Sequence, residues 1–350
     1  TSDAWAVLAP TNYLEAELLW NAGQDWRTVL HRYCRSAFGK GAPWLEKYYL
    51  LLTERQGAAG QEAGSYHAFP LIYDDAFIRE AETLFDRALE CADAPGDKMR
   101  IKYARLPLTM LVKYLEFKHR SATLDFAGAE KSFNELQQQI KDARKRNTNL
   151  FCPTSLRYLD RFYRDFVKCA TKYSTSSYRV ICGLPDRMKT AFDPYDQGEI
   201  MGLAKPEIND RDYVTTATFG ATWDSQGLMG YRFGSAWYRV RIQIPPQNHK
   251  DGIGLMIGGA DSIVRVWCNG KLVGRGQGFA KPFAFDLTDT AEPGKENLLA
   301  IQVQRFGNSE VGTGGLIYPS FVFSGPRLTA TEKPQPPAER LLPGGAVEKK

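Results

Sequence analysis

The spacing of apolar residues changes once along this chain, from helical steps of three and four to the alternation typical of strands. The change comes at KYSTSSYR (172–179). Helical stripes and strand faces are buried by different partners, so the pattern predicts an α + β multidomain fold. We expect an α-helical bundle over residues 1–172, a linker over 173–184, a β-sandwich of the jelly-roll type over 185–326, and a Pro- and Gly-rich tail over 327–350.

Helical stripes fill residues 1–172. Two shorter helices are predicted at 26–38, closed by Gly39, and at 43–55, opened by Pro43. Each apolar stripe needs a partner, so about five or six helices should pack as a bundle. The longer stripes include Phe77, Ala81, Leu84, Ile101, Leu108, Phe126, Phe133, Leu136, Leu159, Phe162 and Phe166.

Short alternating runs fill the second half. In GSAWYRVRIQIP (234–245), Tyr238 and Val240 lie on one face, while Trp237, Arg239 and Arg241 lie on the other. This alternation predicts an antiparallel strand with one wet face, and we expect Arg239 and Arg241 to pack against a neighbouring domain. Asn-Gly at 269–270 predicts a tight hairpin between two such runs.

Composition narrows the class of protein. The 350 residues carry a net charge of only +5, with both signs mixed along the chain. This balance does not favour nucleic acid as a partner, and no apolar run is long enough to span a membrane. The chain starts at Thr1 without Met, which is compatible with a removed signal peptide.

Cysteine and histidine give no metal signature. The six cysteines have no short spacing, and the four histidines stand far apart. We therefore predict no metal cage and no cofactor, although a disulfide between Cys152 and Cys169 stays open. A structural Ca²⁺ in a sandwich loop also stays open, with Asp286 and Asp289 as weak candidate ligands.

Four motifs stand in order between residues 223 and 322. They are WDSQGLMGYRFGSAWYRVRIQIP (223–245), DSIVRVWCNGKLVGRGQGFAKPFAFDLTD (261–289), NLLAIQVQ (297–304) and GTGGLIYPSFV (312–322). In this order they resemble the sugar-binding jelly-roll domain of family 2 glycoside hydrolases. The resemblance implies a galactose-binding-like β-sandwich.

The N-terminal half carries a second resemblance. NYLEAELLWNAGQDWRTVLHRYCRSAFGKGAPWLEKYYLLL (12–52) is similar to the helical region that follows the catalytic barrel in a bacterial glucuronidase- and hexosaminidase-like domain family of unknown function. This resemblance implies that a catalytic barrel precedes the helices in a longer protein and that the protein is bacterial.

Sugar binding needs aromatic rings for the pyranose face and polar groups for its hydroxyls. For each candidate, packing or a turn is the alternative explanation, and for Trp267, directly before the hairpin turn, packing is favoured. The candidate sugar-binding residues are Trp223, Asp224, Gln226, Tyr231, Arg232, Trp267, Arg275, Asn308 and Tyr318.

Catalysis by this chain is not favoured. A glycosidase needs two carboxylates across a sugar, and Glu15 and Glu17 point to different sides of a helix. Asp224 and Asp261 are the sandwich candidates, and we assign no catalytic residue.

The leading hypothesis is a noncatalytic carbohydrate-binding or accessory module of a secreted or periplasmic bacterial protein that handles polysaccharide. Its partners would be a poly- or oligosaccharide and an upstream catalytic barrel. One alternative is a glycoside hydrolase or polysaccharide lyase with its site between the two halves. Another is a purely structural scaffold for a missing catalytic domain.

Overall fold

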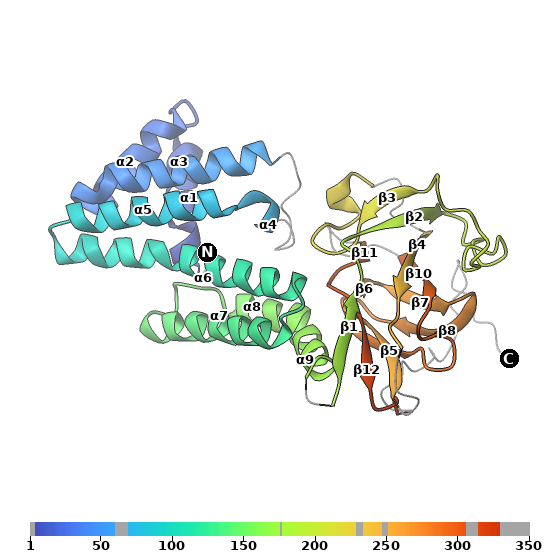
Figure 1. The fold of residues 1–350 in the computed structure, drawn as a ribbon. Helices are drawn as coiled ribbons and strands as arrows, with labels where there is room; N and C mark the ends of the chain where they lie inside the picture. The colour runs from blue at the N-terminus through green and yellow to red at the C-terminus, as the bar shows by residue number, and fades with distance from the viewer. Residues whose placement is uncertain are drawn as a thin grey trace, which may run out of the picture. The chain divides into compact units, whose positions relative to one another are not determined.

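The structure is a computed structural model that describes residues 4–59, 69–175, 177–228, 234–246, 251–305 and 314–329. Helices come first and strands follow, in the order that the change of apolar spacing predicts (Figure 1). The chain divides into two compact units. The helical unit is Thr1–Ala63, Phe69–Thr123 and Gly128–Arg161, and the sandwich unit is Gly64–Ala68, Leu124–Ala127 and Phe162–Lys350.

The predicted helix at 26–38 is present with its expected ends. The Asp25 side chain accepts a hydrogen bond from the Thr28 amide at 3.0 Å, and Gly39 ends the helix with a φ of 53°. The helix that contains Pro107 continues through it. The helices are α1 (Trp5–Trp20), α2 (Trp26–Phe38), α3 (Ala42–Ala58), α4 (Phe69–Ile72), α5 (Asp75–Cys91), α6 (Pro95–Ala122), α7 (Phe126–Arg146), α8 (Pro153–Leu159) and α9 (Asp165–Lys172), with a π-helical turn at Asp160–Arg164.

The apolar stripes of the helical unit pack against one another. Phe77, Phe85 and Ile101 are fully buried, and the rings of Phe117 and Phe133 lie 5.5 Å apart between α6 and α7. Helix α1 differs, because its apolar residues do not gather on one face and none of its residues is buried. Its last two residues, Leu19 and Trp20, are 88% and 93% exposed.

The strands of the sandwich unit form two larger antiparallel sheets. One has the order β1-β12-β5-β9 and the other the order β3-β2-β4-β10-β7-β8, while β6 and β11 pair separately. The strands are β1 (Arg179–Gly183), β2 (Arg187–Asp193), β3 (Val214–Ala217), β4 (Gly234–Gln243), β5 (Gly252–Ile257), β6 (Ala260–Asp261), β7 (Ile263–Cys268), β8 (Lys271–Gln277), β9 (Phe283–Asp286), β10 (Glu296–Arg305), β11 (Gly315–Leu316) and β12 (Phe321–Gly325).

One apolar core lies between the two larger sheets. Tyr238 and Val264 from the six-stranded sheet join Leu255 and Val322 from the four-stranded sheet in this core. Both residues of the turn between β7 and β8 have positive φ, 50° at Asn269 and 79° at Gly270, so the predicted hairpin is confirmed. The face of the six-stranded sheet that points away from this core is called the outer face below.

The helical segment before β1 belongs to the sandwich unit. Phe166 of α9 lies 4.9 Å from the ring of Tyr318, and Tyr173 stacks on Phe323 at 4.6 Å. The Tyr318 hydroxyl donates a hydrogen bond of 2.7 Å to the carbonyl of Phe162. These contacts bury aromatic rings that the strands alone would leave exposed.

Two further observations concern the cysteines and the length of the helices. All six cysteines are free thiols, so the disulfide considered between Cys152 and Cys169 is absent. Within the described ranges, no helix has the length and apolar character that crossing a membrane requires.

Candidate functional site

The outer face of the six-stranded sheet is covered by the segment between β2 and β3, residues 194–213. Asp193 fixes the start of this covering segment, because its carboxylate accepts hydrogen bonds from the amides of Gln197 and Gly198 at 2.8 and 2.7 Å. The same carboxylate accepts from Trp237 Nε1 at 3.0 Å. A Cβ on Gly198 would lie 2.2 Å from that indole nitrogen, so only glycine allows this approach.

Arg239 fixes the rest of the covering segment. Its guanidinium, whose side chain is 0% exposed, donates to the carbonyls of Leu203, Lys205 and Ile208 and pairs with Asp210 at 2.9 Å. The predicted wet face is therefore wrong for this part of β4. Arg239 packs against a segment of its own domain, not against a neighbouring one, because that segment folds back over the strand.

Five polar residues meet at one end of the outer face, and we call them the outer-face polar cluster: Asp196, Ser235, Arg265, Gln302 and Gln304. The register pairs Gln304 with Ser235 and Gln302 with Arg265, which places these four on one face. Asp196 accepts from Gln302 Nε2 at 2.6 Å and from Ser235 Oγ at 3.1 Å. Arg265 Nη1 donates to Gln302 Oε1 at 2.7 Å.

Gln304 has one polar atom without a partner. Its Nε2 donates to Asp196 Oδ2 at 3.1 Å, which fixes the orientation of the amide, since a carboxylate can only accept. Its Oε1 is buried and has no hydrogen-bond partner among the described residues. Gln304 as a whole is 6% exposed, whereas the side chain of Asp196 is 31% exposed and that of Arg265 14%. The cluster therefore combines a buried acceptor with two charged groups that reach solvent.

A separate buried ion network lies at the end of β10, on the core side. Arg305 Nη1 lies 3.3 Å from Asp224 Oδ1, and its Nε lies 3.3 Å from Asp261 Oδ2. The side chains of Arg305 and Asp261 are 0% exposed and that of Asp224 is 2% exposed. Asp224 and Asp261 therefore face a guanidinium in the interior and do not form a carboxylate pair across an open space.

The aromatic candidates for sugar binding have packing roles in this structure. Trp223 is 1% exposed and donates from Nε1 to the Tyr238 hydroxyl at 2.6 Å. Trp267 is 3% exposed and packs against Trp237 with the ring centroids 4.7 Å apart, and Tyr318 is 1% exposed against α9. All three rings are buried, as the packing alternative predicts for Trp267, and a role of Trp223, Trp267 or Tyr318 in sugar binding stays a prediction.

The polar candidates divide into three groups. Gln226 uses its amide on the backbone of Ala217, Ala221 and Thr222, so it stabilises a turn. Arg275 of β8 is half-buried opposite Arg265 in the register, next to the outer-face polar cluster. Three candidates lie outside the described residues, and their roles stay predictions: Tyr231, Arg232 and Asn308.

The candidate Ca²⁺ ligands are engaged with a cation of the protein. Asp286 lies 3.3 Å from Arg327 Nε, and Asp289 pairs with the same guanidinium. Over the described ranges, no group of three or more His, Cys, Asp or Glu side chains could hold a metal ion.

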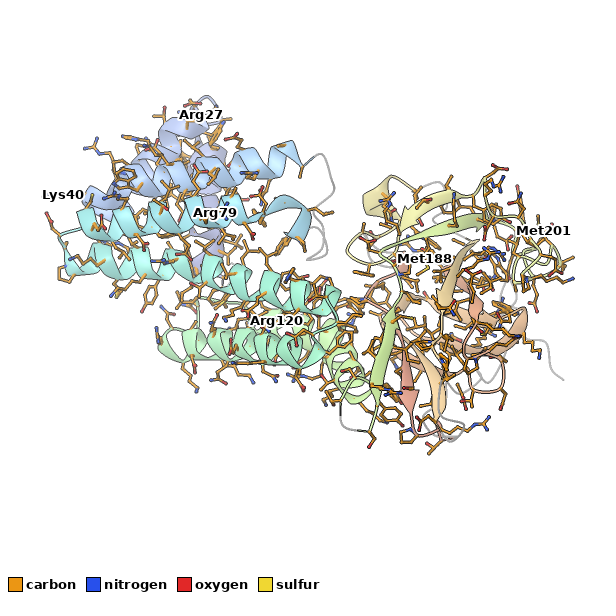
Figure 2. The ribbon with its side chains drawn as sticks, in the orientation of Figure 1. Arg27, Lys40, Arg79, Arg120, Met188 and Met201 are labelled. Atoms are coloured by element: carbon orange, nitrogen blue, oxygen red, sulfur yellow. The ribbon has the colours of Figure 1, made fainter. Side chains whose placement is uncertain are left out.

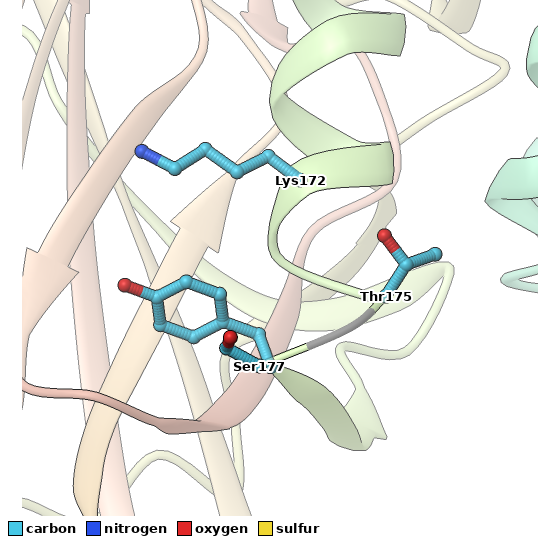
Figure 3. A pocket seen from close by; sticks show the side chains of 4 residues that line it. Lys172, Thr175 and Ser177 are labelled. Carbon is cyan, nitrogen blue, oxygen red and sulfur yellow. The ribbon is translucent and has the colours of Figure 1, made fainter.

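A small pocket lies between the end of α9 and the start of β1 (Figure 3). Lys172, Thr175, Ser177 and Tyr178 line it, and its volume is about 250 Å³, below the range typical of ligand pockets. Thr175 Oγ1 already donates to the Thr171 carbonyl at 2.8 Å. We therefore prefer the outer-face polar cluster as the candidate site.

The two-sheet fold and its order of motifs can now be compared with known proteins. Residues 207–317 match the family described as glycosyl hydrolases family 2, sugar binding domain. The matched residues contain the outer-face polar cluster except for Asp196, which lies just before them.

Relatives and solved structures were found for parts of the chain. A β-galactosidase of Thermoanaerobacter pseudethanolicus is 30% identical over 96 residues, 27% of this chain and 13% of that protein. A β-galactosidase of Vibrio vulnificus is 36% identical over 69 residues, 20% of this chain and 7% of that protein. A β-glucuronidase of Ruminococcus gnavus aligns with a TM-score of 0.37 and 19% identity, over 44% of this chain and 29% of that one. The chain thus spans 13% or less of these β-galactosidases.

No motif in the sequence pointed to the outer-face polar cluster. Gln302 and Gln304 are not among the candidate sugar-binding residues, and both are buried. The available signal was their chemistry, because two neutral amides at alternate positions of a long apolar strand suit a partly covered face better than an open one. Asp196 gave no signal, since it comes from a loop about a hundred residues away.

Proposed function

We propose that the sandwich unit binds carbohydrate without hydrolysing it, as an accessory module of a bacterial glycoside-hydrolase-like protein. The match of residues 207–317 to the family 2 sugar-binding domain carries this proposal. The outer-face polar cluster supports it, because converging amide, carboxylate and guanidinium groups are those that orient sugar hydroxyls.

The pairing of carboxylates with arginines supports the noncatalytic part of the proposal. A glycosidase needs one carboxyl group with a raised pKa and a second one facing it. Burial raises the pKa of Asp210, but the hydrogen bond and charge of Arg239, together with Arg241, outweigh this and hold the pKa below its usual value. Asp224 and Asp261 pair with Arg305. The ion pairs and hydrogen bonds of these carboxylates stabilise the fold.

The proposal extends to the protein around the module. A catalytic barrel would be the partner domain of the module. The whole protein would act outside the cell or in the periplasm on a poly- or oligosaccharide. The barrel rests on the resemblance of residues 12–52, and the location on the usual place of polysaccharide breakdown in bacteria.

Two assays on the full chain test the proposal. A glycan array with a pull-down on insoluble polysaccharides should show binding, and assays with aryl glycosides and polysaccharides should show no product. Protein unfolded by heat is the control for nonspecific adhesion. Absence of binding to every glycan would overturn the proposal, and product formation that follows the protein through successive columns would overturn its noncatalytic part.

A further inference from the structure

We propose that helix α1 forms an interface between two copies of this chain, in which the two α1 helices pack antiparallel across a twofold axis. The inference goes beyond the proposed function and does not depend on sugar binding. It gives a role to a surface that the helical unit leaves open. We call this surface the α1 face, and it consists of Trp5, Leu8, Ala9, Asn12, Ala16, Leu19 and Trp20.

The α1 face exposes more apolar area than a helix of a soluble protein usually does. Trp20 is 93% exposed, Leu19 is 88% exposed and Trp5 is 49% exposed, and no residue of α1 is buried. The residues of the α1 face recur at helical spacing, so they share one side of the helix. A contiguous apolar patch of this kind commonly marks a binding surface.

Contacts on one flank and at both ends hold α1 in place. Tyr13 packs against Tyr33 of α2 with the ring centroids 5.4 Å apart. The amide of Trp5 donates to a backbone carbonyl between α7 and α8 at 2.9 Å. In the last turn, the Glu17 carboxylate pairs with Arg32 at 2.7 Å. The exposed rings are therefore carried by an anchored helix.

The order of residues on the α1 face is complementary to itself. In an antiparallel pair with its axis beside Asn12, Trp5 faces Trp20 of the other copy, and Ala9 faces Ala16 of the other copy. Large rings then meet at both ends, where aromatic pairs add to the effect of buried area. Small side chains meet near the middle, where they let the two helices approach closely. A twofold interface requires such a self-complementary patch.

The charges of α1 favour the antiparallel arrangement over the parallel one. Glu15 and Glu17 are the only charged residues of this helix. In the antiparallel pair they face Pro10 and Leu8 of the other copy. A parallel pair would instead bring each glutamate next to its own equivalent, and like charges at close range repel.

The available area suits a weak dimer. At their observed exposures, the rings of Trp5 and Trp20 present about 350 Å² together. With Leu19 and the smaller residues, the α1 face offers roughly 600 Å² per copy, which is the lower end for specific interfaces. We therefore expect a dissociation constant of about 1–100 μM.

Sedimentation velocity of the full chain from about 1 to about 200 μM tests the inference. The mass should rise with concentration from 39.4 kDa toward twice that value. Trp20→Glu brings a carboxylate against Trp5 of the other copy and should raise the dissociation constant at least roughly tenfold. Ile200→Glu is the matched control, because Ile200 is 90% exposed and directly precedes Met201, which Figure 2 shows at the surface of the sandwich unit.

A pair of substitutions tests the antiparallel arrangement. Ala16→Glu alone should weaken the dimer, and adding Ala9→Lys should restore it, because the two positions face each other with opposite charge across the axis. Within one copy the two positions lie about two helical turns apart, so the restoration requires the second copy. Circular dichroism and a melting curve establish that each variant is folded.

The outcomes decide between the second copy and other uses of the α1 face. A chain that stays monomeric up to about 200 μM overturns the inference, and the α1 face is then left for another domain or protein. A dimer that Trp20→Glu weakens no more than Ile200→Glu has its interface elsewhere, which also overturns the inference. Glycan binding bears on the proposed function alone, so the two proposals fail separately.

Discussion

Single buried charges hold the sandwich unit together at positions far apart in the sequence. Arg239 connects β4 to the covering segment, and Arg305 connects the end of β10 to Asp224 and Asp261. Each guanidinium offers several donors in a fixed plane, which suits the joining of separate backbone segments. At the scale of the residue, these two arginines are structural and are not free to meet a ligand.

Arg305→Met should destabilise the sandwich unit by about 3–5 kcal/mol, because it removes the guanidinium that faces two buried carboxylates. Urea unfolding followed by tryptophan fluorescence measures the change. Arg241→Met is the control, since that side chain is 39% exposed and its ion pairs should contribute less than about 1 kcal/mol. Equal effects of the two substitutions would contradict the assignment.

Asp210 should make the stability of the sandwich unit depend on pH. Its pKa in the folded state is lowered, so its contribution is complete above the unfolded pKa near about 4 and is lost as the pH falls through the folded pKa. Asp210→Asn should therefore lower the unfolding free energy by about 1–3 kcal/mol at pH 7. Unfolding titrations at pH 7 and at low pH should show the two proteins converging in acid, and a constant difference would refute the prediction.

Elements cover one another in ways that their own patterns do not reveal. The segment 194–213 has no strand or long helix, yet it buries Trp237 and Trp267 together with Leu203 and Ala204. Helix α9 has a predictable apolar stripe, but its partner is the aromatic surface beside β12. Which element covers which face follows from tertiary contacts.

The packing of α9 can be tested with one substitution on each of its faces. Phe166→Ala should destabilise the sandwich unit by about 3–5 kcal/mol, because the ring is 1% exposed against Tyr318. Lys168→Ala on the exposed face should change stability by less than about 0.5 kcal/mol. Melting temperatures from differential scanning fluorimetry compare the two, and a mild effect of Phe166→Ala would mean that the helix is not needed there.

The whole molecule consists of two units, each with its own core. Phe85 is buried in the helical unit and Ile301 in the sandwich unit. The apolar residues of the first core follow helical spacing, and those of the second follow the alternation of strands. Domains with separate cores commonly unfold in separate transitions.

Calorimetry should therefore show two transitions that respond to different substitutions. Phe85→Ala should lower the midpoint temperature of one transition, and Ile301→Ala that of the other. Each substitution leaves a cavity that destabilises one core by about 2–5 kcal/mol. The unaltered chain is the reference. A single transition that moves with both substitutions would contradict the prediction.

The local features could be predicted from the sequence: helix 26–38 with its glycine end, the Asn-Gly hairpin, and the change from helices to strands. These depend on neighbours within a few residues, which is why spacing and turn chemistry predict them. Which faces are covered and where polar groups converge depend on tertiary contacts. Trp223 and Trp267 are indistinguishable from ligand platforms until their neighbours are known, and Gln304 meets Asp196 across 108 residues. Burial and hydrogen bonding across such separations are set by packing, and no local pattern encodes them.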